Sequence, residues 1–330
     1  MFEFLGFGKN GDRAVEAEEP TEPPVKQRPT IGLALGGGAA RGFAHIGIMQ
    51  VLIEAGLKPD VIAGTSIGAL AGGLYAAGRL DPFSEWSLQL TRRSVFGYMD
   101  FSFSGSGLIG GDRLAGRLNG ELGDLTIEEL PVRFAAIATE VGTGHEIWLT
   151  RGRLVDALRA AYALPGIFAP VLIGQRWLVD GALVNPVPVS AARALGARLV
   201  IAVNLNSDLF GRGVTISSYG GDEQEVKAPL EKDASGAPVL KEVQRAVKRQ
   251  VLNVGRRPGI PTVMMDAFNI MQDRITRARL AGDPPDVSIN PRLGGIGLFE
   301  FHRAAESIAL GREAAERSLE QIHQALNALA

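Results

Sequence analysis

A serine between two glycines is the first group in this sequence that could carry out a reaction. Ser66 lies in Gly64-Thr65-Ser66-Ile67-Gly68, which matches the G-x-S-x-G pattern. In that pattern the serine occupies a tight turn between a strand and a helix, and the glycines leave room for the chain to bend and a substrate to approach. A chain with 42 glycines also meets the pattern by chance, so its weight depends on context. The apolar run Val61–Ala63 before it and Ile67–Ala77 after it predict the required strand and helix.

A second glycine-rich turn precedes the serine turn. Gly36-Gly37-Gly38-Ala39-Ala40-Arg41-Gly42 follows the apolar run Ile31–Leu35. Backbone N–H groups in such a turn, beside a helix N-terminus, bind an anion or an oxyanion that forms during a reaction. A dinucleotide fingerprint or a plain tight turn is the alternative. The pattern G-x-G-x-x-G fails here because Arg41 and Ala39 occupy required glycine positions, and no acidic residue ends the second strand.

A nucleophilic serine needs a base, and histidine is the usual one. The sequence contains four histidines: His45, His145, His302 and His323. Ser66, Asp180 and His302 occur in the order of an α/β-hydrolase triad, but His302 lies in a predicted helical stretch, with no loop to carry it to the serine turn. Asp180 follows the apolar Trp177-Leu178-Val179 and is expected where a strand turns, with a surface turn as the alternative.

The elements that must position these residues are strands alternating with helices. Strands are predicted over Ile31–Leu35, Val61–Ala63, Val132–Thr139 and Arg198–Asn204, and helices over Ala39–Ala55, Ile67–Ala77 and Arg153–Leu164. This alternation predicts an α/β fold with a mainly parallel central sheet and helices on both faces. Ligands of such folds bind at the carboxyl ends of the strands, where both glycine-rich turns fall.

Four segments differ in composition. Residues 1–29, rich in Glu and Pro, predict a solvated tail, in which Phe2, Phe4, Leu5 and Phe7 offer contact with a membrane or the domain, with a frayed terminus as the alternative. Residues 30–205 form the predicted core. Residues 206–261 predict a mobile loop and a basic amphipathic helix at 240–254, which packs on the domain or, alternatively, is a lid or lies on anionic lipid. Residues 262–330 predict a helical part that packs on the core.

Composition excludes several classes of protein. The 330 residues are 46% apolar and 21% charged, which is typical of a globular chain. A net charge of −2 argues against a general nucleic-acid binder, and the absence of cysteine excludes a disulfide framework, a thiolate nucleophile and a Cys-ligated metal. No His/Asp/Glu cluster has ligand spacing, so no metal or organic cofactor is expected.

The sequence carries no targeting or spanning signal that we recognise. The first ten residues lack a basic n-region and a cleavage site, and the longest uncharged stretch, 61–78, contains five glycines. We therefore expect a cytoplasmic chain. Peripheral contact with the inner face of the membrane is compatible with that location and is a second hypothesis.

Three ordered motifs resemble the patatin-like phospholipase family, bacterial branch. They are Gly36-Gly37-Gly38…Arg41-Gly42, Gly64-Thr65-Ser66-Ile67-Gly68 and Asp180-Gly181-Ala182. Further stretches agree in order and spacing: Phe43-Ala44-His45-Ile46-Gly47, Ala138-Thr139-Glu140, Ala163-Leu164-Pro165-Gly166-Ile167-Phe168 and Val184-Asn185-Pro186-Val187-Pro188. The similarity runs from about residue 31 to 205 and resumes weakly around 262–303. Ala39 stands where the family often has glycine.

The resemblance implies a three-layer fold related to the α/β-hydrolases and a Ser–Asp dyad, with Ser66 as nucleophile and Asp180 as base. The amides of Gly37 and Gly38 would hold the oxyanion, with Gly36 and Arg41 close to the bound anion. A free aspartate, with a pKa of about 3.9, is a weak base for a hydroxyl, so the site must partly desolvate Asp180.

The implied activity is hydrolysis of lipid acyl esters, of phospholipase A or lysophospholipase type, with phospholipid or lysophospholipid as substrate. Acyl position, chain length, head group, turnover of acyl-CoA or soluble esters, and oligomeric state are left open. A non-catalytic lipid-binding or regulatory protein with the same fold is the alternative, and a dinucleotide-dependent oxidoreductase is a third.

Overall fold

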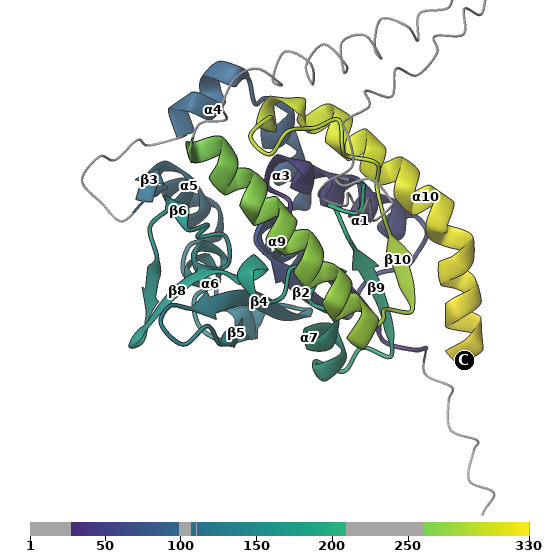
Figure 1. Cartoon of the computed structure of the whole chain (residues 1–330). Helices are drawn as coiled ribbons and strands as arrows, with labels where there is room; N and C mark the ends of the chain where they lie inside the picture. Colours follow the sequence, from purple (N-terminus) through teal and green to yellow (C-terminus); the bar gives the residue numbers. More distant parts are fainter. Residues whose placement is uncertain (1–27, 99–106, 110, 209–259, 330) are drawn as a thin grey trace, which may run out of the picture.

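The computed structural model describes residues 28–98, 107–109, 111–208 and 260–329. Its strands are β1 (Ile31–Leu35), β2 (Val61–Thr65), β3 (Gly107–Ile109), β4 (Arg133–Glu140), β5 (Glu146–Leu149), β6 (Gly166–Phe168), β7 (Val171–Ile173), β8 (Arg176–Asp180), β9 (Leu199–Val203) and β10 (Val287–Ile289). Eight of them form one sheet in the order β10-β9-β1-β2-β4-β8-β7, with β5 paired to β4 (Figure 1). Strands β3 and β6 form a separate parallel pair.

The centre of the sheet is parallel. Strands β10, β9, β1, β2 and β4 run in one direction, whereas β5 and β8 pair with β4 in the antiparallel sense. Every residue of β1, β2 and β9 is buried, which fits their unbroken apolar sequences because a parallel sheet is covered on both faces. The four predicted strands are confirmed to within a few residues.

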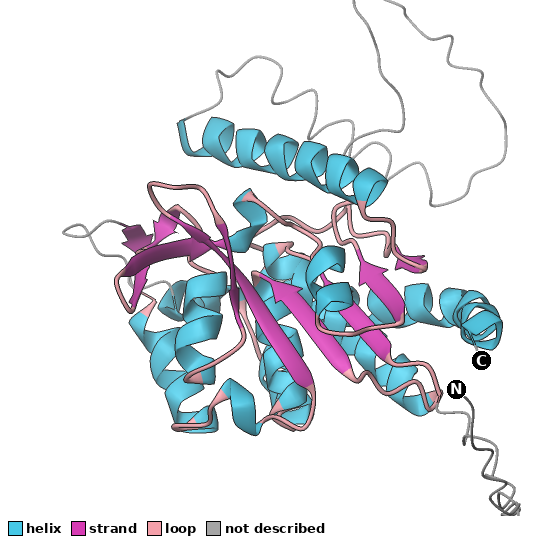
Figure 2. Ribbon diagram, turned by 90° about the horizontal axis from the view of Figure 1, so that it is seen from below, coloured by secondary structure: helices cyan, strands magenta, loops and turns pink. Residues whose placement is uncertain are grey.

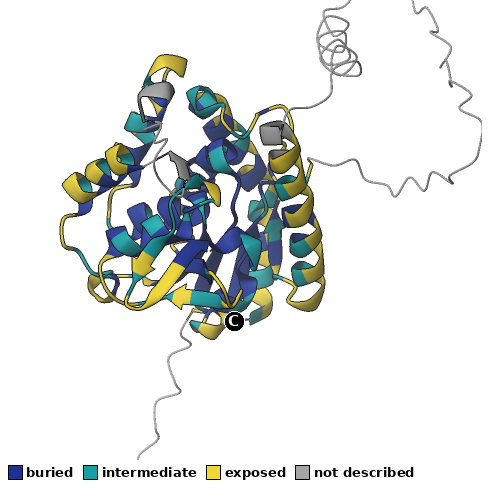
Figure 3. Cartoon of the chain, turned by 60° about the vertical axis from the view of Figure 1, so that its left-hand side comes forward, coloured by how far each residue is buried: buried dark blue, intermediate teal, exposed yellow. Residues whose placement is uncertain are grey.

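Helices cover both faces of this sheet. The helices of the described residues are α1 (Ala44–Glu54), α2 (Ile67–Ala76), α3 (Leu80–Leu88), α4 (Arg92–Tyr98), α5 (Asp112–Leu122), α6 (Leu154–Ala161), α7 (Val189–Ala194), α9 (Ile260–Gly282) and α10 (Ala304–Leu329), of which all but α9 belong to the layers on the two faces (Figure 2). The larger apolar core lies between the sheet and α1, α2, α6 and α10, and a smaller one lies under α7. Buried residues accordingly fill the middle of the molecule, and exposed residues lie on the outer sides of the helices (Figure 3). The three-layer α/β fold is confirmed.

Two glycines allow α1 and α10 to pack with their backbones in contact. A Cβ added to Gly47 would lie 2.1 Å from the carbonyl oxygen of Ile308, and one added to Gly311 would lie 2.2 Å from that of Ala44. Real Cβ atoms do not approach that closely, so any side chain here would separate the two helices.

Some predicted boundaries change. The helix expected over Ala39–Ala55 begins with the 3-10 turn η1 (Ala39–Phe43), and the one expected up to Leu164 ends at Ala161. The C-terminal part is not purely helical, because β10 extends the sheet beside β9. Residues 1–27 and 209–259 lie outside the described residues, so the tail and the helix at 240–254 stay predictions.

The long helix α9 lies across the end of the sheet toward which the parallel strands point (Figure 2). It is separate from the helical layers that cover the two faces. Within the described ranges, neither α9 nor any other helix is long and apolar enough to cross a membrane.

Candidate active site

Ser66 occupies a strained backbone position between β2 and α2. Its φ is 56° and its ψ is −127°, a region that residues with a side chain rarely adopt. Such strain persists only where the surrounding structure holds it, and it concentrates at functional sites. The predicted strand, turn and helix around the serine are confirmed.

The two glycines of the serine turn are required by close packing. A Cβ at Gly64 would lie 2.5 Å from the backbone of Ala69, and one at Gly68 would lie 2.2 Å from the carbonyl oxygen of Leu35. Neither glycine has a positive φ. The pattern therefore brings the start of α2 directly against the turn and against the end of β1.

Ser66 and Asp180 meet in the fold. The Ser66 hydroxyl donates to Oδ2 of Asp180 over 2.6 Å, across 114 residues of sequence. Strand β4 aligns them, because its neighbouring residues Ile137 and Ala138 pair with Thr65 and Asp180 respectively. The end of the parallel strand β2 and the end of the antiparallel strand β8 are thus held by consecutive residues of one strand.

Asp180 is a buried residue that three hydrogen bonds besides the one from Ser66 hold in place. Its Oδ1 accepts from the N–H of Ala182, its backbone N–H donates to Ala163, and its carbonyl accepts from the Thr139 hydroxyl. Burial raises the pKa of Asp180 to about 7, against the opposing effect of its hydrogen bonds from Ser66 and Ala182. The side chain is 1% exposed, so it is not the surface turn residue of the alternative interpretation.

The glycine-rich turn is held mainly through its own backbone. The N–H of Gly36 donates to Val203, the N–H of Gly37 donates to Pro186 (3.1 Å for both), and Nε2 of His45 lies 2.8 Å from the Gly36 carbonyl oxygen. Both N–H groups therefore have acceptors within the protein. The predicted roles of Gly37 as an oxyanion donor and of Gly36 as an anion contact stay predictions, which these hydrogen bonds do not favour.

The next two amides of the turn differ. Among the described residues, no acceptor takes a hydrogen bond from the N–H of Gly38 or of Ala39. Gly37, and with it the turn, lies against Ser66: a Cβ built on Gly37 would be 3.4 Å from the serine Cβ. Ala39 has a φ of 48°, which explains why glycine suits this position.

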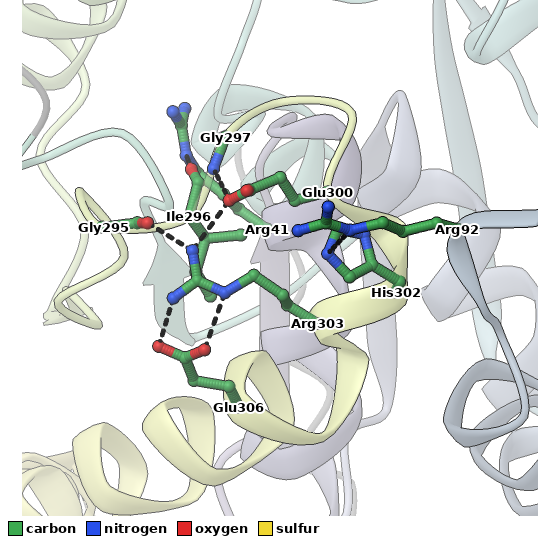
Figure 4. Close-up of polar contacts among 9 residues, drawn as sticks. All are labelled: Arg41, Arg92, Gly295, Ile296, Gly297, Glu300, His302, Arg303 and Glu306. Atoms are coloured by element: carbon green, nitrogen blue, oxygen red, sulfur yellow. Dashed lines mark hydrogen bonds and ion pairs between the residues drawn. The ribbon is translucent and has the colours of Figure 1, made fainter. Parts of the chain in front are cut away.

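Arg41 is buried, and its guanidinium is bonded within the protein. Its Nε donates to the Ile296 carbonyl across 2.8 Å (Figure 4). Its Nη1 donates to Oδ1 of Asn206 across 3.2 Å. Burial lowers the pKa of Arg41, and the charge of Asp208 opposes that shift. The guanidinium ties the glycine-rich turn to the C-terminal part of the chain, and its expected anion-binding role stays a prediction that these contacts do not favour.

Two polar residues that the sequence did not single out complete the turn. Nδ2 of Asn206 donates to the carbonyl oxygen of Gly37 and to Oε1 of Gln272 on α9, both over 3.2 Å. Asn206 lies just beyond the carboxyl end of β9, and that position in an α/β sheet was the signal available in the sequence. Nothing local marked Gln272.

The stretches that accompanied the main motifs also reach the site. Thr65 donates to the carbonyl of Asn185, next to the Pro186 carbonyl that holds Gly37. The segment around 184–188 thereby binds the serine turn and the glycine-rich turn to each other.

An apolar cavity of about 150 Å³ adjoins Ser66. Its lining is Ala39, Ser66, Ile67, Leu70, Trp86, Leu90, Val95, Leu114, Tyr162, Leu164, Ile167, Phe168, Phe299 and Phe301. The lining has almost no polar side chains besides Ser66 and Tyr162, which suits an acyl chain and not a charged ligand.

His302 does not complete a triad. It lies in the 3-10 turn η4 (Phe301–Arg303), and its Nε2 accepts from Nε of Arg92 over 3.2 Å (Figure 4). All four histidines belong to the described part of the chain, and there none of them hydrogen-bonds to Ser66 or Asp180. The same part also contains no group of three or more His, Asp or Glu residues that could hold a metal ion.

Comparison with known proteins gives one family. A family model described as patatin-like phospholipase matches residues 33–193. An NTE family protein of Mycobacterium tuberculosis, described as uncharacterized, is 33% identical over 88% of this chain and 92% of its own. Neuropathy target esterase sws of Drosophila melanogaster is 30% identical over 58% of this chain and 14% of its own. The crystal structure of VipD from Legionella pneumophila matches 92% of this chain and 67% of the VipD chain, with a TM-score of 0.45 and 13% sequence identity. This similarity is too remote to add to the family assignment.

Proposed function

Because the chain belongs to the patatin-like phospholipase family, we propose that it is a serine acyl hydrolase acting on lipid esters, of phospholipase A or lysophospholipase type. The observation that carries the proposal is the hydrogen bond from Ser66 to the buried Asp180, formed on a strained turn beside an apolar cavity. A strained serine, a desolvated base and an acyl-sized cavity are needed together by such an enzyme and by few other proteins.

In the acylation step the oxygen of Ser66 attacks the ester carbonyl carbon while its proton passes to Oδ2 of Asp180. A pKa near 7 makes this carboxylate a far better base than a solvated aspartate, because a catalytic base works best with a pKa close to the operating pH. When the tetrahedral intermediate collapses, Asp180 returns the proton to the departing alcohol, and the acyl group stays on Ser66.

The oxyanion formed in that step needs N–H donors that are free beforehand. The amides of Gly38 and Ala39 meet this requirement among the described residues. In a trans peptide the C=O and N–H point in opposite directions, so Asn206, by holding the Gly37 carbonyl, directs the Gly38 N–H the other way. Donors fixed in advance stabilise the oxyanion without reorganisation during the reaction.

The second step releases the acid. Asp180 takes a proton from water, the resulting nucleophile attacks the acyl carbon, and Ser66 leaves with the proton that Asp180 returns. One carboxylate therefore serves as base and then acid in both halves of the cycle. The apolar cavity would hold the acyl chain throughout.

Labelling with a fluorophosphonate, followed by intact-mass analysis, tests the proposal. We expect one adduct on the unaltered protein and on a Ser318→Ala control, and none on Ser66→Ala. Labelling that is equal in all three proteins, or absent from all three while a known serine hydrolase is labelled, would reject the proposal and favour a lipid-binding protein without catalysis.

A further inference from the structure

Helix α9 turns polar side chains toward the protein. Asn269, Gln272, Asp273 and Thr276 recur three or four residues apart and so share one face, and the last three are buried. A helix packed on a globular core normally has the opposite arrangement, with the apolar face inward. With this polar face buried, several apolar side chains of α9 lie on the outside.

The outward face of α9 has four large apolar side chains that are about half exposed. Their exposed fractions are 49% for Val263, 59% for Met264, 48% for Ile270 and 50% for Met271. The pairs 263 and 270, and 264 and 271, lie seven residues apart, so the four side chains form one strip along two turns. Exposed apolar side chains gathered in this way mark a surface that contacts lipid or another protein.

Cationic side chains continue the strip. Arg274 and Arg277 follow on the same outward face, and both are exposed, although Arg277 also pairs with Asp273 over 2.8 Å. Asp266 lies at the edge of the face. Apolar residues next to arginines fit the boundary between acyl chains and anionic head groups.

The strip lies at the end of the molecule that holds the site. Gln272, on the opposite side of α9, is bonded to Asn206, which holds Gly37 next to Ser66. Phe299 lines the apolar cavity and is itself 40% exposed, so it marks a place where the cavity lining reaches the surface. Figure 2 shows α9 at the same end of the sheet, outside the helical layers.

We infer that this outward face, defined by Val263, Met264, Ile270 and Met271, docks on an anionic lipid surface. The inference takes its lipid substrate from the proposed function. An acyl chain must leave a bilayer to enter the cavity beside Ser66, and an apolar strip at the same end of the molecule shortens that transfer. The exposed Arg274 beside the strip can pair with an anionic head group, whereas a purely apolar protein partner would leave its charge unpaired.

Vesicle co-sedimentation tests the inference in a Ser66→Ala background, where binding does not depend on hydrolysis. The vesicles contain phosphatidylcholine with or without phosphatidylglycerol. The face variant is Met264→Gln, Ile270→Gln and Met271→Gln, which keeps good helix formers. The matched control is Val141→Thr, Leu172→Thr and Trp177→Thr, three apolar residues of the β-strand region that are 51%, 52% and 53% exposed. Thermal unfolding checks that both variants fold.

The face variant is expected to need about tenfold more lipid for half-binding, which corresponds to about 1.4 kcal/mol, whereas the control stays within about twofold. Binding should weaken in high salt and without phosphatidylglycerol. Equal binding by the face variant and its parent overturns the inference. The inference is also overturned if the face variant binds vesicles like its parent and differs only in sedimentation velocity, which would indicate that this face joins two copies of the chain. It is overturned as well if the variant differs only in thermal unfolding, which would indicate that another segment of the same chain packs on this face. Failed phosphonate labelling with intact vesicle binding would reject the proposed function alone.

Discussion

At the scale of single residues, the site combines groups that are unfavourable for folding. Ser66 has a backbone conformation suited to glycine, and Asp180 is a carboxyl group deprived of water. A single substitution at either residue can remove the backbone strain or the buried charge, and it also removes the side chain that we propose to react. The protein should therefore become more stable when these groups are replaced, which is the reverse of the effect at ordinary buried positions.

Replacing Ser66 separates backbone strain from chemistry. We expect Ser66→Gly and Ser66→Ala both to abolish ester hydrolysis, with the glycine variant more stable by about 1 kcal/mol, because only glycine adopts this φ and ψ without strain. Urea unfolding of the two variants measures the difference. Equal stability of the pair would show that the turn stores no strain.

Replacing Asp180 with asparagine should stabilise the protein in a pH-dependent way. The folded pKa, raised to about 7, lies above the unfolded value of about 3.9, so stability is lost as pH rises from about 4 to 7 and the loss then stays constant. Asp180→Asn avoids that loss, so its advantage should grow over the same interval.

Unfolding at pH 4, 5.5, 7 and 8.5 measures this advantage, and an advantage that is constant with pH would contradict the buried-carboxylate account. In the unaltered protein, kcat/KM should rise with pH and level off above about 7, as Asp180 loses its proton.

Asn206 offers a test of how the proposed oxyanion donors are directed. In Asn206→Asp the shape and the contact with Arg41 are kept, but the donor to the Gly37 carbonyl is lost. We expect kcat to fall by about tenfold to a hundredfold with little change in KM, since removing a whole oxyanion donor costs about a hundredfold to a thousandfold. The control Asn119→Asp, which keeps its contact with Arg153, should retain activity. An equal rise in KM would indicate a binding role instead.

At the scale of elements, the packing of α1 against α10 depends on glycine. Gly311→Ala should destabilise the fold by about 1–3 kcal/mol, because the new Cβ meets the backbone of Ala44, which cannot rotate away. Gly120→Ala on α5 is the matched control: nothing lies within 4 Å of its added Cβ, and alanine favours a helix by about 1 kcal/mol. Denaturant unfolding of both variants should therefore give changes of opposite sign. The same sign in both would contradict the close contact.

At the scale of the whole molecule, acid should act on the fold through His45. Burial lowers its pKa to about 4, below the usual 6.5, so it contributes stability that is present above pH 6.5 and is lost as pH falls toward 4. His45→Gln, whose amide can still donate to Gly36, should be less stable at pH 7.5, and its deficit should shrink as pH falls to 4.5. Unfolding measured across that interval checks this, and a constant deficit would show that the pKa of His45 is the same in the folded and unfolded states.

The amino-acid sequence by itself indicated the strands and helices around the site and the candidate pair Ser66 and Asp180. Unbroken apolar runs predicted β1, β2, β4 and β9, and the strand–turn–helix around Ser66 followed from spacing that is local in the chain. Asp180 was placed at the end of a predicted strand, and its role as base came from the resemblance to the family. These features depend on neighbours in sequence, so a linear pattern contains them.

The tertiary structure alone decided how the glycine-rich turn is used. The N–H of Gly37 donates to the carbonyl oxygen of Pro186, and the guanidinium of Arg41 donates to oxygens of Ile296 and Asn206. These partners lie far away along the chain. Whether an amide is free for a ligand depends on which carbonyl the fold places opposite it, and no local pattern records that. The meeting of Ser66 with Asp180 through consecutive residues of β4 has the same origin, since strand register is set by packing of the whole sheet.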